Sequence, residues 1–133
     1  MATSEAPTSR RAVIISPNSP LVSELEPLLS VHLAGIPISR LQTYPSPRDL
    51  PGLMGGGVLN LAFLDTTSDP AQGLLLLEEL SRMGAQVQVV ALLGSNDPDF
   101  ILRCLRAGAQ DFLIQPFSSA EVEAALGKLR SEE

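Results

Sequence analysis

The chain has 133 residues, 44% of them apolar, and carries a formal net charge of −6 at pH 7. This length fits one domain, and the negative charge argues against direct binding of nucleic acid, which requires clustered Lys and Arg. The longest apolar runs fall far short of the ~20 residues of a membrane span, and the single cysteine, Cys104, cannot form an internal disulfide. We therefore expect a cytoplasmic protein that does not insert into a membrane.

Residues 1–10 are rich in Ser, Thr, Ala and Pro, which predicts a disordered leader ahead of one folded domain over residues 11–130. Strand-like apolar segments recur along that domain. They cover residues 12–15, 36–44, 58–65, 87–93 and 111–114. A helical pattern follows each of them, although the prolines after residue 44 leave room for only a short or distorted helix over 48–54.

The segment from Val58 to Asp65 is the most informative of these strands. Six of its eight residues are apolar and they do not alternate with polar ones, which is typical of a strand buried on both faces of a parallel sheet. Asp65 ends the segment. A carboxylate at the carboxyl end of such a strand lies where open α/β sheets bind their ligands.

The alternation of strand and helix, with short links, predicts a doubly wound parallel sheet. We expect the flavodoxin-like strand order 2-1-3-4-5 in a three-layer α/β/α arrangement. In that order the first and third strands are neighbours. The turn Ser16-Pro17-Asn18 should then face Asp65 across one crevice.

Three of the predicted helices begin with a proline that follows a short polar residue. We expect Ser19 and Asp69 to be N-caps, and Asp97-Pro98 to start the helix after the fourth strand. The helix after Asp97 should bury Ile101, Cys104 and Leu105 on one face, which makes Cys104 a small core residue rather than a reactive thiol. The last helix should follow a capping box made by Ser118 and Glu121.

Asp65 at the end of the third strand, Ala107-Gly108-Ala109 after the fourth helix and the run from Phe112 to Phe117 resemble the receiver domain of response regulators. The similarity covers residues 11–130. Taken as a whole, the sequence most resembles the atypical receiver-like domain that precedes the ATPase of CpaE/TadZ pilus-assembly proteins. The resemblance implies a CheY-like fold and a role in two-component signalling.

Receivers accept a phosphoryl group from a kinase phosphohistidine on one aspartate. The resemblance places that aspartate at Asp65. It also implies an acidic pair after the first strand that holds Mg²⁺, a Thr or Ser that ends the fourth strand and a Lys after the fifth. These groups position and neutralise the transferring phosphoryl group, which is the usual source of catalysis in phosphoryl transfer.

This chain departs from that pattern at each supporting position. Ser16 and Pro17 stand where the acidic pair is expected, Leu93 stands for the hydroxyl residue and Gln115 for the Lys. Mg²⁺ prefers a shell of hard oxygens that includes carboxylates, so Asp65 alone should bind it poorly. Phe112 matches the switch aromatic, a position that core packing explains equally well.

We therefore favour a pseudo-receiver that is not an enzyme, holds no cofactor or metal, and acts by binding protein without phosphorylation. In that case Asp65 caps nearby backbone N–H groups. Two alternatives stay open: a genuine phosphoacceptor that uses Mg²⁺ with Asp65, and a flavodoxin-like domain that binds a small ligand. A hydrolase is the least favoured class, because the one histidine, His32, is not placed to complete a Ser-His-Asp set.

The resemblance also suggests where a partner binds. Receivers commonly contact an effector domain, or a second copy, through their fourth helix, fifth strand and fifth helix. In this chain that surface should carry residues of both charge signs: Arg103, Arg106, Gln110, Glu121, Glu123 and Lys128. The resemblance further implies a cis peptide bond between Gln115 and Pro116.

Overall fold

Strand β3 (Leu59–Asp65) lies at the centre of a five-stranded parallel sheet in the computed structural model, which describes residues 9–55 and 57–130. It pairs with β1 (Arg10–Ile15) on one side and β4 (Val87–Leu93) on the other. The edge strands are β2 (Ile38–Leu41), beside β1, and β5 (Asp111–Ile114), beside β4. The order β2-β1-β3-β4-β5 confirms the predicted topology.

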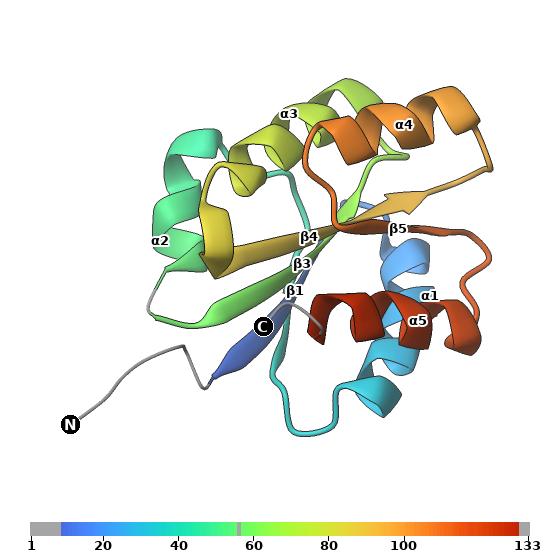
Figure 1. Ribbon diagram of the computed structural model, residues 1–133, viewed down its shortest axis with the longest axis horizontal. Helices are drawn as coiled ribbons and strands as arrows, with labels where there is room; N and C mark the ends of the chain where they lie inside the picture. Colours follow the sequence, from blue (N-terminus) through green and yellow to red (C-terminus); the bar gives the residue numbers. More distant parts are fainter. Residues whose placement is uncertain (1–8, 56, 131–133) are drawn as a thin grey trace.

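Helices cover both faces of the sheet, as Figure 1 shows. On one face, α1 (Ser19–His32) and α5 (Ser119–Arg130) enclose a core that includes Phe63. On the other face, α2 (Leu50–Met54), α3 (Pro70–Ser81) and α4 (Pro98–Arg106) enclose a second core. The expected α/β/α layers are therefore confirmed, and within the described residues no helix is long and apolar enough to cross a membrane.

The prolines after β2 shorten the second crossover as expected. A 3-10 turn (Pro47–Asp49) leads directly into the five-residue α2. A second 3-10 turn (Gly84–Gln86) leads into β4. Pro27 lies inside α1, which nevertheless continues to His32.

The N-cap predicted at Asp69 is confirmed, and Asp97 caps the helix that it was expected to start. The carboxylates of Asp69 and Asp97 accept the backbone N–H groups of Gln72 and Phe100. The prediction for Ser19 is wrong by one residue, because Asn18 caps α1 through its Oδ1, which accepts the Leu21 N–H at 3.3 Å.

Other boundaries also differ from the sequence prediction. Arg10 belongs to β1, so the predicted leader ends earlier than residue 10, and residues 1–8 lie outside the described residues. In α4, Cys104 is buried as expected, whereas Leu105 is 38% exposed and does not share its face. The nine residues of α4 make about two and a half turns, and among them only Cys104 is buried, whereas Ile101 is half-buried and Leu105 is exposed.

Gly108 connects α4 to β5 in a conformation that favours glycine. Its φ is +119°, and a Cβ at this position would lie 2.1 Å from the Ser81 Oγ of α3. The positive φ and the close approach of α3 both select glycine here.

Candidate functional site

The candidate site lies at the carboxyl ends of β1 and β3, where the strand order places them side by side. Asp65, the last residue of β3, is fully buried, and Ser16, directly after β1, is nearly so. The Ser16 hydroxyl donates a hydrogen bond of 2.8 Å to Asp65 Oδ2. The structure thus brings together the two residues that the predicted topology set face to face.

The chain that follows β3 turns back on the Asp65 carboxylate. Thr67 donates both its backbone N–H, at 2.6 Å, and its hydroxyl, at 2.7 Å, to Oδ1. Ser68 donates its hydroxyl to Oδ2 at 2.7 Å and its N–H to Oδ1 at 3.3 Å. We call Ser16, Thr67 and Ser68, with these bonds, the hydroxyl cage of Asp65.

The hydroxyl cage sets the charge state of Asp65. Burial is the largest single effect and raises the pKa of the carboxyl group, because a low-polarity environment disfavours the charged form. The hydrogen bonds from Ser68, Thr67 and Ser16 act in the opposite direction and together outweigh it. The pKa of Asp65 is therefore below its ordinary value, and the group is a carboxylate at neutral pH.

Tyr44, in the loop after β2, stabilises the same turn through a hydrogen bond to its backbone. Its hydroxyl donates to the backbone oxygen of Asp65 at 2.7 Å. Partial burial, with the nearby Asp65 charge as the second cause, raises the pKa of Tyr44 to about 12. The phenol therefore remains a donor throughout the physiological pH range.

The positions that depart from the receiver pattern have structural roles or none at this site. Pro17 is exposed, and Leu93 is buried in the core on the α3 and α4 side. Gln115 does not turn toward Asp65. Its side-chain amide instead donates to Glu24 Oε1, on α1, at 3.0 Å.

Glu24 is a residue that the sequence analysis did not single out. Its second oxygen accepts the Phe117 N–H at 2.7 Å, so one carboxylate holds both ends of the link between β5 and α5. This link includes the Gln115–Pro116 peptide bond, which is cis as predicted. Glu24 lies 91 positions from Gln115, and no local pattern in the sequence marks the pairing.

The residues present do not fit the Mg²⁺ ion that the receiver resemblance implies. A cation at Asp65 would need further carboxylate or carbonyl oxygens, but the groups around its side chain are hydrogen-bond donors. Within the described residues, no three His, Cys, Asp or Glu side chains form a group that could hold a metal ion.

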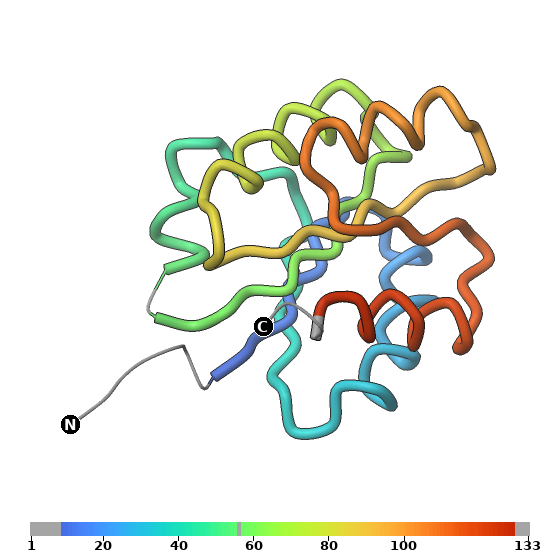
Figure 2. Tube along the Cα trace, viewed as in Figure 1, coloured from blue at the N-terminus to red at the C-terminus, as the bar shows by residue number. Residues whose placement is uncertain are grey.

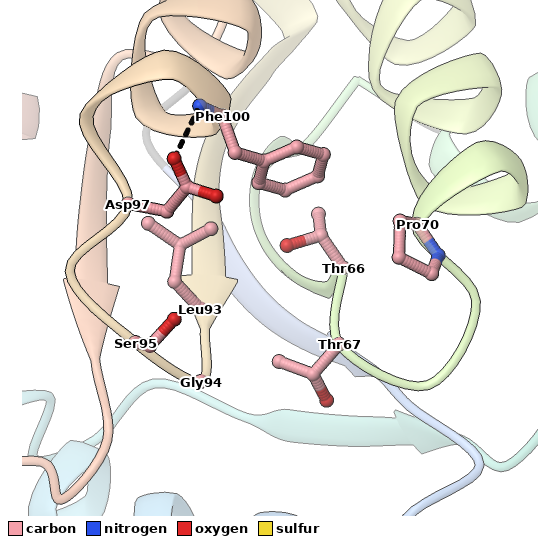
Figure 3. Close-up of a pocket in the computed structure, with 8 residues that line it drawn as sticks. All are labelled: Thr66, Thr67, Pro70, Leu93, Gly94, Ser95, Asp97 and Phe100. Atoms are coloured by element: carbon pink, nitrogen blue, oxygen red, sulfur yellow. Dashed lines mark hydrogen bonds between the residues drawn. The ribbon is translucent and has the colours of Figure 1, made fainter.

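A cleft of about 300 Å³ opens beside the hydroxyl cage, between the ends of β3 and β4 (Figure 3). Thr66 and Thr67 form one wall, and Ser95 and Asp97 form the other. Phe100 lies at the side of α4 that faces Pro70. Among the described residues that line the cleft, Asp97 is the one ionisable group, so none of them could take the place of the missing Lys.

The residues predicted for the surface of α4, β5 and α5 all lie at exposed positions. Arg106, Gln110, Glu121 and Glu123 are exposed, and Lys128 pairs with Asp111 at 3.5 Å. Arg103 is exposed as well, and its guanidinium lies over the ring of Phe100, 5.8 Å from the ring centre. Phe112 is half-buried against the core, so its packing accounts for its position.

No family model matches the chain. Among curated proteins it is 28% identical over 121 residues to the transcriptional regulatory protein MalR of Bacillus subtilis (strain 168), a match that covers 91% of this chain and 51% of MalR. Over 69 residues it is 26% identical to the chemotaxis protein CheY of the same organism, which covers 52% of this chain and 58% of CheY. The chain spans about half the length of these curated relatives.

Solved structures with the same fold include the pilus assembly protein CpaE of Burkholderia thailandensis E264, with a TM-score of 0.75 and 17% identity over 92% of this chain and 99% of that one. The signal receiver domain of the response regulator MerR from Colwellia psychrerythraea 34H also has a TM-score of 0.75 and 17% identity, over 93% and 100%. At this identity they show the fold alone. Together with the sequence relatives, they confirm the resemblance to response-regulator receiver domains.

Proposed function

Because its homologues are response-regulator receiver domains, we propose that this chain is a signalling domain that acts by binding protein, without phosphorylation of Asp65. The hydroxyl cage is the observation that carries this proposal. Both oxygens of the buried carboxylate already accept short hydrogen bonds from Ser16, Thr67 and Ser68. The carboxylate then serves to fold the turn after β3.

A genuine phosphoacceptor is the competing function, and the site lacks what it needs. To attack phosphorus, one oxygen of Asp65 has to lose its hydrogen bonds and reach solvent. Charge on the transferring phosphoryl group would meet neither a bound cation nor a Lys, since Gln115 is engaged with Glu24. Loss of even one such stabilising group costs ~10²–10³ in rate, so the combined loss leaves transfer negligible.

We place the protein-binding surface on α4, β5 and α5. The exposed residues there carry both signs, with Arg106 on α4 and Glu123 on α5. Mixed charges favour a partner or attached effector domain with a complementary mixed surface, and they set specificity and association rate more than affinity. Leu105, beside Arg106, is 38% exposed and adds an apolar side chain to this surface that a partner could contact.

A narrower proposal concerns the process that the domain serves. The CpaE structure is a pilus assembly protein, and a related Burkholderia pseudomallei structure is pilus assembly-related. The match to this chain covers 99% of the first structure and 93% of the second, which supports a domain of the same type. We therefore propose pilus assembly as the setting to test first.

The test is co-purification from cells that produce the tagged chain. We expect the wild type and Asp65→Asn to retain the same partner, with or without acetyl phosphate and Mg²⁺. Arg106→Glu and Glu123→Arg should each weaken retention, and Arg48→Glu, an exposed change remote from this surface, should not. Retention that requires acetyl phosphate, or that Asp65→Asn abolishes, would contradict the proposal.

A further inference from the structure

Exposed apolar side chains gather on two neighbouring helices. Among the described residues, five large apolar side chains are exposed, and three of them lie on α3 and α4. Leu75 is 45% exposed on α3, opposite the buried Leu76, Leu77 and Leu80, and Leu102 is 44% exposed on α4, opposite Cys104. Single exposed apolar residues are ordinary, but their grouping on one surface marks a contact site.

The two helices form one continuous surface. Pro70 of α3 and Phe100 of α4 line the same cleft, and Gly108, after α4, approaches Ser81 of α3. Figure 2 shows the two helical segments running side by side along one edge of the molecule. Each helix returns from a strand of the same parallel sheet, so α3 and α4 run in the same direction.

Charges follow the leucines at matching distances on this surface. Glu78 lies three residues after Leu75, and Arg106 lies four residues after Leu102, so both are one helical turn beyond their leucine. Glu78 and Arg106 are exposed, and neither belongs to an ion pair within the described part of the chain. We call Leu75, Glu78, Leu102 and Arg106 the α3–α4 face.

We infer that the α3–α4 face binds a second copy of this chain about a two-fold axis parallel to the helices. That axis sets α3 of one copy on α4 of the other, with both helices running in the same direction. Leu75 then meets Leu102 of the second copy, and Glu78 meets its Arg106. The symmetry repeats both contacts, so the apolar pair and the ion pair each form twice.

The matched charges select a second copy over a different partner. One acid on α3 and one base on α4 complement each other across the axis, whereas a purely acidic or purely basic partner would meet a like charge. One turn before the leucines, Asp99 of α4 in one copy faces the uncharged Ala71 or Gln72 of α3 in the other. The inference shares Arg106 of α4 with the proposed function but uses α3 in place of β5 and α5, so variants at Glu78 and Glu123 distinguish the two.

The size of the face predicts a weak dimer. Helices of 12 and 9 residues are roughly 18 and 14 Å long and pack about 10 Å apart. The surface that they offer is smaller than the ~800 Å² per partner of a standard stable interface. Dimer formation should therefore depend on concentration and be detectable only when the chain concentration is well above micromolar.

Sedimentation equilibrium over a concentration series tests the inference. We expect the wild type to shift from monomer to dimer, and Leu75→Ser to raise the dissociation constant at least tenfold. Glu78→Arg and Arg106→Glu should each weaken the dimer, and the double charge exchange should restore most of the loss. All three side chains are exposed, and circular dichroism verifies that each variant folds.

Glu123→Arg on α5 is the matched control, because it reverses an exposed charge outside the α3–α4 face. It should leave the dimer unchanged even though it weakens partner binding under the proposed function. A chain that stays monomeric throughout the series overturns the inference. So does a dimer that Glu123→Arg breaks and Glu78→Arg does not, or single charge reversals that the double exchange fails to rescue.

Discussion

Replacement of Asp65 should destabilise the fold, because the hydroxyl cage is built around its charge. In Asp65→Ala, the Thr67 N–H and the buried Ser16 hydroxyl lose a charged acceptor. Each such hydrogen bond contributes ~1.5–3 kcal/mol, and the relief of no longer burying a carboxylate offsets part of the loss. We expect Asp65→Ala to lower the free energy of unfolding by about 3 kcal/mol.

Asp65→Asn is the more informative variant, because it keeps one acceptor oxygen for Thr67 while it removes the charge and replaces the other acceptor oxygen with an amide donor. We expect a loss of ~1–2 kcal/mol in urea unfolding at pH 7. Asp69→Asn is the matched control, since Asn caps a helix as well as Asp does, and its effect should stay within ~0.5 kcal/mol.

The pH dependence has a definite sign. The pKa of Asp65 is lowered in the folded protein, so the unfolded chain takes up its proton first as the pH falls. The stability that the carboxylate contributes is therefore complete above the unfolded pKa of about 4 and is lost as the pH falls through the folded pKa. The difference in free energy of unfolding between the wild type and Asp65→Asn should therefore shrink as the pH falls over that range.

A gain of stability in Asp65→Asn would refute this reasoning. Sites built for phosphoryl transfer hold several carboxylates close together, and removal of one relieves their repulsion. The hydroxyl cage contains donors instead, so the removal of charge should cost stability at neutral pH.

Further predictions concern the surroundings of the site. Gly108→Ala should destabilise the fold by roughly 2 kcal/mol or more in urea unfolding, whereas Gly127→Ala, whose new Cβ meets nothing within 4 Å in α5, should stabilise it by ~0.5–1 kcal/mol; equal effects would contradict the argument. Tyr44, the one tyrosine of the chain, should ionise near pH 12 in an ultraviolet titration, and the stability it contributes should fall as the pH rises from about 10 to about 12; ionisation near its ordinary pKa would show that the phenol is not buried beside the Asp65 charge. Glu24→Ala should speed hydrogen exchange at the Phe117 amide and lower stability by ~1–2 kcal/mol, whereas Glu26→Ala, a change on the same helix that removes only the ion pair to Arg40, should leave that exchange unchanged.

The arrangement of the sheet could be predicted from the sequence because it depends on local patterns. Unbroken apolar runs such as the one in β3 identify buried parallel strands, and the order of strands and helices leaves few topologies. Once the order 2-1-3-4-5 was predicted, the proximity of Ser16 and Asp65 followed from it. Thr67 and Ser68 lie two and three residues after Asp65 in the chain, so the contact of their hydroxyls with its carboxylate could also be predicted.

The remaining site contacts join residues that no local pattern connects. Glu24 meets Gln115 and Phe117 only because α1 packs beside the link from β5 to α5. Tyr44 reaches Asp65 from the far side of β1. The N-cap of α1 was misplaced because Asn18 and Ser19 are both good caps, and the hydrogen bond from the Asn18 N–H to Ser16 Oγ favours the turn that starts the helix after Asn18.

The claim that Asp65 is a structural carboxylate is tested most directly by incubating the chain with acetyl phosphate and Mg²⁺ and measuring its intact mass. The hydroxyl cage predicts an unchanged mass for the wild type, even with Mg²⁺ at millimolar concentration. A mass increase of one phosphoryl group that is absent from Asp65→Asn would contradict the account.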